Sequence, residues 1–198
     1  LKTQNVKPEN WYKQYWPESL ALTDGNTSIS LWSTFKDAKI DNFRGELKAE
    51  NYNLYTQNKH VAKIITLDAK ISGKHNPTGD WIFNMDLNSL ETENGLWPSS
   101  TYAVSVNPLQ NESHKIISIE YDYLKLNDTF PVLSHFITPT KPLIENLTGE
   151  LINGTVIYNS SESPGNKLHL NTTFQNITPP INNLSTTLTN ISGKISGG

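Results

Sequence analysis

The sequence predicts an all-β chain, and three observations support this prediction. First, apolar and polar residues alternate in several segments, as they do in a β-strand, where successive side chains point to opposite faces. These segments are residues 29–35, 61–71, 81–87 and 117–123. Second, turn-forming residues separate them, at Asp24-Gly25, at 73–79, at Asn94-Gly95 and at Asn107-Pro108. Third, no window longer than ten residues carries the apolar stripe of an amphipathic helix.

Residues 95–106, GLWPSSTYAVSV, predict how the strands are connected. A bulky apolar residue, a proline and then a tyrosine that opens an alternating strand form the pattern of a tyrosine corner, in which the hydroxyl ties a connecting loop to its strand. Tyr102 is the candidate, and an ordinary strand that begins with tyrosine is the alternative. Short strands at regular spacing favour a Greek-key β-sandwich.

Composition divides the chain into three parts. Residues 1–19 form an extended N-terminal segment with clustered tryptophan and tyrosine, and residues 20–178 form the sandwich. After Pro179-Pro180, residues 179–198 contain no aromatic residue and almost no charge. Their alternation predicts a strand, but they have too little apolar mass to fold alone. A loose tail is the alternative interpretation, because chain ends often fray.

The bulk composition excludes several classes of function. Only 18% of the 198 residues are charged, the net charge is −3, and no run of lysine or arginine is present, so we expect no nucleic-acid partner. No run of 18 apolar residues is present, so we expect no membrane span. A chain that begins with Leu1 is consistent with a removed export signal or a trimmed sequence.

Asn-X-Ser/Thr triplets are unusually frequent. There are ten without a central proline, about twice the number expected by chance, and nine of them follow residue 110. The acceptor candidates are Asn26, Asn111, Asn127, Asn146, Asn153, Asn159, Asn171, Asn176, Asn183 and Asn190. We interpret them as sites of dense N-glycosylation on an extracellular protein. Chance matches in a chain rich in Asn, Ser and Thr are the alternative.

Three of these triplets fall within ENLTGELINGTVIYNSS, residues 145–161. We predict that this segment is one β-hairpin, with Asn153-Gly154 as its tight turn. Asn146 and Asn159 then lie opposite the better apolar faces. All three asparagines are expected to face water.

No constellation of catalytic or metal-ligating residues is visible. The chain has no cysteine, and its histidines lack metal-ligand spacing. Phosphate-binding, GxSxG and HExxH motifs are absent from the sequence. Five carboxylates are candidates for acid–base chemistry, but their spacing does not identify a catalytic pair: Asp68, Asp80, Asp86, Glu120 and Asp122. We therefore predict no enzyme, no metal and no cofactor apart from covalent N-glycans.

Tryptophan offers a different function, because an exposed indole can stack on a sugar ring. We expect Trp32 and Trp81 to lie in the core, since both alternate with apolar partners. Trp11, Trp16 and Trp97 lie in loops or in the N-terminal segment and are the candidates for exposure. The alternative function is therefore a monomeric cell-surface or surface-layer-associated domain that binds surface glycans.

Taken together, the triplets, the missing cysteines, the alternating strands between residues 29 and 158 and the strand-like ends resemble the subunit of the archaeal thread, a surface filament of thermoacidophilic archaea. This resemblance implies a pilin-like β-sandwich that is N-glycosylated, extracellular and linked head to tail to identical subunits by donor-strand complementation. It also implies a cell-surface appendage that serves adhesion. Bacterial chaperone–usher pilins share this logic, but they usually carry a disulfide.

The exchanged strand is predicted at one end of the chain. We favour the C-terminal segment, through Leu184, Leu188, Ile191, Gly193 and Ile195. It follows the Pro-Pro break, alternates regularly and has no sequence neighbour with which to pair. The N-terminal segment is the second candidate, although Pro8 removes a hydrogen-bond donor from it.

Overall fold

A computed structural model describes residues 2–6, 20–56, 59–76, 79–108, 115–133, 148–162, 168–178 and 191–197. This part of the chain forms twelve β-strands and one α-helix, which confirms the all-β prediction. The bounds are β1 (Lys2–Val6), β2 (Leu20–Thr23), β3 (Asn26–Lys36), β4 (Lys39–Thr56), β5 (Lys59–His75), β6 (Trp81–Thr92), β7 (Gly95–Trp97), β8 (Ser100–Pro108), β9 (Lys115–Lys125), α1 (Leu126–Leu133), β10 (Thr148–Asn159), β11 (Leu168–Thr178) and β12 (Ile191–Gly197).

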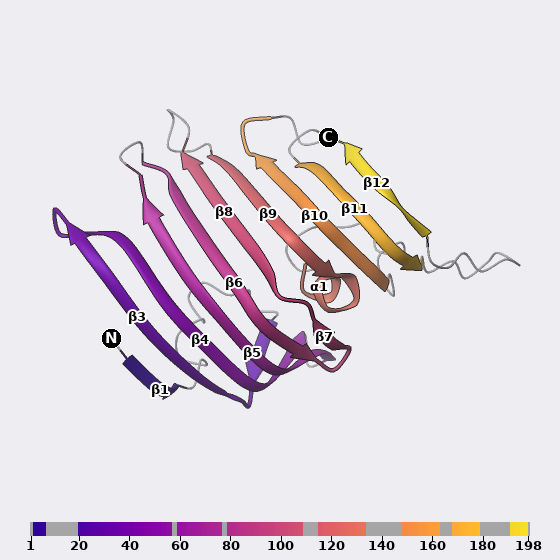
Figure 1. Cartoon of the computed structure of the whole chain (residues 1–198), viewed down its shortest axis with the longest axis horizontal. Coiled ribbons are helices and arrows are strands. Elements are labelled where there is room, and N and C mark those ends of the chain that lie inside the picture. The colour runs from indigo at the N-terminus through magenta and orange to yellow at the C-terminus, as the bar shows by residue number, and fades with distance from the viewer. Residues whose placement is uncertain are drawn as a thin grey trace, which may run out of the picture.

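The twelve strands form a single antiparallel sheet (Figure 1). Its order is β1-β3-β4-β5-β6-β8-β9-β10-β11-β12, with β2 paired to β4 and the short β7 paired to β6. Neighbours in the sheet are thus close neighbours in the sequence, which is a meander. The predicted Greek-key or pilin-like sandwich is not confirmed, because a Greek key needs a strand that returns past its sequence neighbours.

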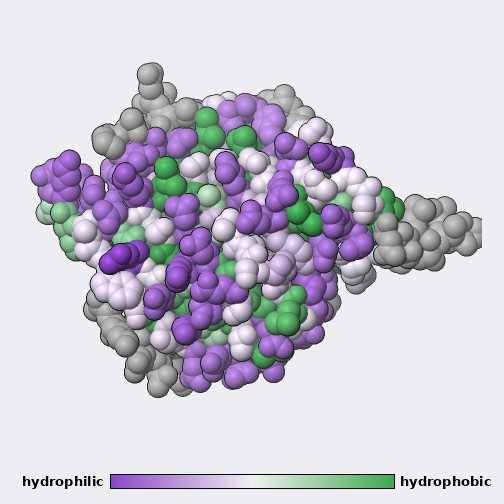
Figure 2. All heavy atoms as spheres, in the orientation of Figure 1, coloured by the Kyte–Doolittle hydropathy of each residue, from purple (hydrophilic) through white to green (hydrophobic). Residues whose placement is uncertain are grey.

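Alternation gives this sheet an apolar face and a polar face. On the apolar face, Phe43, Gly73 and Phe83 lie opposite one another on β4, β5 and β6, with the two phenyl centroids 6.2 Å apart. A Cβ at Gly73 would collide with the Phe43 ring, so glycine lets that ring lie across β5. Successive side chains of a strand point to opposite faces, so the next residue of β4 points to the polar face. The view in Figure 2 shows hydrophilic residues over most of the molecule, with hydrophobic ones scattered among them.

The helix α1 and the buried residues show where the sheet curls. Leu126, at the start of α1, is buried, and α1 contacts β5, β9 and β10. Because β6 and β8 separate β5 from β9, a helix of eight residues reaches both only if the sheet curls at this end. The buried hydrophobic residues of the described part are Ala49, Tyr52, Leu54, Ala62, Ala69, Leu87, Tyr121 and Leu126.

The predicted turn at Asp24-Gly25 is instead a bend along one edge. Strands β2 and β3 pair in succession with the same partner, β4, and the two turn residues lie between them with φ of 60° and 80°. On β4, Asn51 also has a positive φ, of 56°. Asp24-Gly25 therefore separates two strands, as predicted, but the chain bends there without reversing, because the same φ > 0 chemistry serves a turn and a bulge.

The predicted hairpin at Asn153-Gly154 is wrong. Strand β10 runs through both residues without turning, and it pairs with β9 on one side and β11 on the other. The register against β11 shifts between Ile152 and Thr155, and Asn153 has a φ of 50°. The dipeptide therefore forms a β-bulge within one continuous strand.

Candidate functional site

The two ends of the chain form the two edges of the sheet (Figure 1). Strand β1 pairs with β3 at one edge, with Lys2 opposite Ser30. Strand β12 pairs with β11 at the other edge, with Ile195 opposite Thr172. Edge strands offer unpaired backbone groups on their outer side, and other chains can pair with such groups.

Strand β12 contains three of the five residues predicted for the exchanged strand, namely Ile191, Gly193 and Ile195. Leu184 and Leu188 lie outside the described residues. The expectation that this segment has no neighbour to pair with is corrected, because it pairs with β11 of its own chain. Its isoleucines stay partly in solvent, with Ile195 50% exposed and Ile191 37% exposed.

One contact gives the pairing of β12 a definite register. Gly193 lies opposite Phe174, and a Cβ at Gly193 would come within 2.8 Å of Phe174 Cζ. Glycine thus makes room for the Phe174 ring, as a small residue of an inserted strand would do for a bulky side chain of its groove. A one-residue slip would bring Ser192 or Lys194 to this position and lose the fit.

The acceptor asparagines differ in exposure. Asn26, Asn153, Asn171 and Asn176 are exposed, whereas Asn127 and Asn159 are half-buried. Asn111, Asn146, Asn183 and Asn190 lie outside the described residues. The Asn159 side chain is also engaged, because its Nδ2 donates to Glu162 Oε1 at 2.8 Å and its Oδ1 accepts from Ser161 Oγ at 2.7 Å.

Three of the four exposed acceptor asparagines, Asn26 on β3, Asn153 on β10 and Asn171 on β11, lie on the polar face of the sheet. Asn26 alternates with Thr27, which lies opposite the buried Ala49, and Asn171 alternates with the buried Thr172. Asn153 lies between Ile152 and Gly154, which pair in unbroken register with Tyr123 and Tyr121 of β9 and face the apolar side. Glycans on these three asparagines would leave the apolar face clear.

Tyr102 makes a different contact from the one predicted. Its hydroxyl donates to the carbonyl oxygen of Tyr123 at 2.8 Å. Tyr123 lies on β9, the strand next to β8, so the bond joins two paired strands. A tyrosine corner would instead tie the loop before Tyr102 back to its strand, and that form of the prediction is wrong.

Trp97 is half-buried and is held in place by contacts with the protein. Its Nε1 donates to Asp128 Oδ2 at 2.7 Å, and its ring meets Tyr123 edge-on at 5.4 Å. Asp128 lies in the first turn of α1, is 8% exposed, and also accepts from Thr92 Oγ1 and Asn94 Nδ2. This buried carboxylate ties the β6–β7 turn to the helix. Trp11 and Trp16 lie outside the described residues.

The expectation that Trp32 lies in the core is wrong. Its side chain is 50% exposed. A signal was present in the sequence: Ile29 and Leu31 share one face of β3, which leaves Trp32 on the other face, in line with Ser28 and Ser30. Trp81 is half-buried and stacks on Phe83, with ring centroids 5.5 Å apart.

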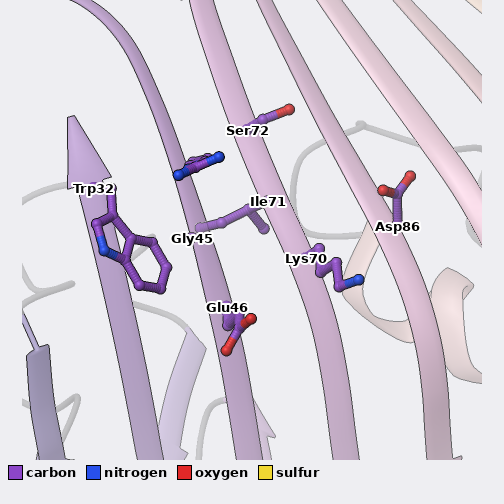
Figure 3. Close-up of a pocket in the computed structure, with 8 residues that line it drawn as sticks. Trp32, Gly45, Glu46, Lys70, Ile71, Ser72 and Asp86 are labelled. Atoms are coloured by element: carbon purple, nitrogen blue, oxygen red, sulfur yellow. The ribbon is translucent and has the colours of Figure 1, made fainter. Parts of the chain in front are cut away.

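A hollow of about 350 Å³ lies beside Trp32 on the polar face (Figure 3). Four strands build it, because Trp32 is on β3, Arg44 and Glu46 are on β4, Lys70 is on β5 and Asp86 is on β6. Of these, the sequence pointed only to Trp32, as a core residue, and to Asp86, as an isolated carboxylate. A second hollow, at the outer end of β12, is lined by Thr155, Ile157, His169, Leu170, Asn171, Ser196 and Gly197.

The titratable groups show no catalytic arrangement among the described residues. No group of three histidine, aspartate or glutamate side chains there is close enough to hold a metal ion. His169 pairs with Glu162 at 3.2 Å and His60 with Glu93 at 3.9 Å, both near the surface. A hydrogen bond from Asn88 lowers the pKa of Asp68. Asp122 accepts from the Thr101 backbone and hydroxyl.

Three tyrosines with a raised pKa serve as hydrogen-bond donors within the sheet. Burial raises the pKa of Tyr102 and Tyr121. Burial also raises the pKa of Tyr123, and the hydrogen bond that its hydroxyl donates to Glu150 adds to the shift. A raised tyrosine pKa keeps the hydroxyl protonated, as a hydrogen-bond donor rather than a nucleophile.

In the described part of the chain, no helix is both long enough and apolar enough to cross a bilayer. Comparisons with protein-family models, with curated proteins and with solved structures find no match to this chain.

Proposed function

We propose that this chain is an extracellular structural subunit that is N-glycosylated and assembles with identical copies into a cell-surface filament for adhesion. One observation carries the proposal: both edges of the single sheet are made by the chain's own terminal strands. In a monomer, such a strand pairs with its own chain. When neighbouring copies exchange this strand, it forms the same pairing with the next copy. Such an exchange costs little, because the same hydrogen bonds and contacts form in both states.

The strand to be exchanged is β12. The segment between β11 and β12, residues 179–190, holds twelve residues, and a chain of that length reaches about 40 Å when extended. That reach lets β12 leave its own β11 and pair with the β11 of the next subunit. The Gly193–Phe174 contact then fixes its register in the new position. Repeated in one direction, this pairing is head to tail and generates a filament.

The glycans fit such a filament. The three exposed asparagines on the polar face leave the apolar face free. Two exposed acceptors, Asn171 and Asn176, lie on β11, the strand that receives β12. Asn171 alternates with the buried Thr172, so its glycan projects away from the apolar face. In this role the chain needs no catalytic site and no cofactor other than its covalent sugars.

Deletion tests the proposal. Purified protein that lacks residues 184–198 should remain folded by circular dichroism, yet form no filaments in negative-stain electron microscopy. The matched control is a chain that lacks residues 1–6, which should still form filaments. If the first deletion forms filaments and the second does not, the N-terminal strand is the one exchanged. If the intact protein forms only particles, the filament proposal fails.

A second function has one specific observation in its favour, the exposed Trp32 beside a polar hollow. That observation is compatible with a filament subunit as well as with a monomeric glycan-binding domain. Microscopy of the native surface material separates the two.

A further inference from the structure

The hollow beside Trp32 is built by residues that lie directly opposite one another on adjacent strands. Trp32 on β3 pairs in register with Arg44 on β4. The guanidinium carbon of Arg44 lies 5.9 Å from the centroid of the indole ring. That distance is within the range of a cation–π contact, so Arg44 helps to hold the indole in place.

Next to the Trp32–Arg44 pair, a row of three side chains across the strands carries alternating charges. Glu46, Lys70 and Asp86 lie opposite one another on β4, β5 and β6. Their side chains are exposed, and no ion pair or hydrogen bond joins them, although a salt bridge of 3.3 Å does join Lys48 and Asp68 nearby. The acceptors and donors of this row are therefore available to a ligand. Figure 3 shows the row beside the indole.

The charges of the hollow select the class of ligand. Arg44 and Lys70 contribute two positive charges and Glu46 and Asp86 two negative charges, so the lining has no net charge. A phosphate or a metal cation would meet as much repulsion as attraction there. A neutral molecule with many hydroxyls fits better, because each hydroxyl both donates and accepts hydrogen bonds.

The indole specifies the ligand further. An exposed tryptophan offers a rigid apolar surface with a polar edge. A pyranose ring has an apolar face of C–H groups and a rim of hydroxyls, so it can stack on the indole while its rim reaches the carboxylates and the ammonium group. The volume of about 350 Å³ lies within the range of small-ligand sites.

The geometry points to a binding site for a neutral sugar ring, with Trp32 as the stacking platform and Glu46, Lys70 and Asp86 as hydrogen-bonding partners. The site goes beyond the proposed assembly and does not depend on it. Such a sugar has two sources: an N-glycan carried by a copy of this chain, or a glycan on another surface. The recognition chemistry is the same for both.

The test is a titration of the full chain with three neutral disaccharides, mannobiose, cellobiose and maltose, and with N-glycans released from the native protein. Saturation-transfer NMR detects the contact, and calorimetry gives the Kd. At least one of these sugars should bind, and Trp32→Ala should weaken its binding about tenfold or more. Asp86→Asn and Glu46→Gln should weaken it less, since each removes only one charged acceptor.

Phe35→Ala is the matched control. Phe35 is an exposed aromatic residue of the same strand, with 66% of its surface accessible, and it does not line the hollow. Its removal should leave the Kd unchanged. Circular dichroism and the Tm of each variant show that the fold is intact. If no sugar binds, or if Trp32→Ala binds as tightly as the natural chain, the assignment is wrong.

The released N-glycans identify the source. If they bind and the disaccharides do not, the ligand is the sugar of a neighbouring copy. Trp32 should then resist hydroxyl-radical oxidation in glycosylated native material and lose that protection once the glycans are removed. If disaccharides bind and released glycans do not, the ligand comes from another surface.

Discussion

The Tyr121 hydroxyl donates a hydrogen bond to Thr172 Oγ1, at 3.0 Å, across the strand that separates them. Tyr121 is on β9, Thr172 is on β11, and β10 passes between them at Gly154, which lies opposite Tyr121. Both partners are almost fully buried, with exposures of 4% and 2%. The bond thus links β9 to β11 across β10, near the edge that receives β12. It can form because Gly154 has no side chain and leaves room for the Tyr121 ring.

Gly154→Ala should destabilise the fold. A Cβ at this position would collide with the Tyr121 ring, and the surrounding β-strands leave the ring little freedom to move. Such overpacking costs about 1–3 kcal/mol of unfolding free energy, or somewhat more. Chemical denaturation measures the loss. Gly197→Ala is the control, because nothing lies within 4 Å of its added Cβ. Equal stability of the two variants would contradict the role given to Gly154.

Asp128→Asn should also destabilise the fold. The buried carboxylate accepts hydrogen bonds from Trp97, Thr92 and Asn94, and an amide offers one acceptor oxygen in place of two. Hydrogen bonds to a charged group contribute about 1.5–3 kcal/mol, so we expect a loss of about 2–3 kcal/mol in denaturation. Tryptophan fluorescence should report the freed Trp97 indole. Asp122→Asn, an exposed acceptor, should cost less; a larger loss there would refute this assignment.

Stability should fall at alkaline pH. The folded chain holds the protons of Tyr102, Tyr121 and Tyr123 more tightly than the unfolded chain does, because burial raises all three pKa values above 10.0. The stabilisation is therefore complete below about pH 10 and is lost as the pH rises through the folded-state values. Urea denaturation at a series of pH values measures this alkaline decrease in the free energy of unfolding. Tyr121→Phe should flatten it, and an unchanged slope would show that Tyr121 does not titrate in the way described.

Glycan occupancy should follow exposure. Asn26, Asn153, Asn171 and Asn176 are exposed, so a folded chain accommodates a sugar on each of them. Asn127 is half-buried in the first turn of α1, beside the buried Asp128, and should carry the least sugar. Glycopeptide mass spectrometry of native protein gives the occupancy of each site. Full occupancy at Asn127 together with bare Asn153 and Asn171 would contradict this order.

The local strand content was predictable from the sequence, but the way the strands are joined was not. The alternation at residues 81–87 correctly predicted a strand of β6 with Leu87 buried, and Asn94-Gly95 marks the observed β6–β7 turn. These signals are local, because side-chain alternation and positive φ depend on a few neighbouring residues.

Long-range pairing carries no such local signal. Asn153-Gly154 has the composition of a turn but forms a bulge, because β9 and β11 are present on both sides to continue the pairing. Conversely, the observed β3–β4 turn uses Asp37 and Ala38, with φ of 50° and 60°. Alanine is a poor residue for such a turn, so no local signal in the sequence marked it.

The candidate sites divide in the same way. The acceptor triplets were visible in the sequence because each depends on three consecutive residues. The hollow beside Trp32 depends on register between β3, β4, β5 and β6, which brings Arg44, Lys70 and Asp86 into one place. Register is a property of the assembled sheet, and the separation of these residues in the sequence concealed it.

A cysteine trap tests strand exchange most directly, since the chain has no cysteine of its own. Ile177 and Ile191 lie directly opposite on β11 and β12, and residues so paired have Cα atoms about 4.5–5.5 Å apart, which suits a disulfide. We predict that oxidation of assembled Ile177→Cys/Ile191→Cys protein gives a ladder of covalent multimers on a non-reducing gel, which a reductant collapses to monomer. A disulfide-linked monomer from the same assembled material would show that β12 stays with its own chain, and would contradict assembly through this strand.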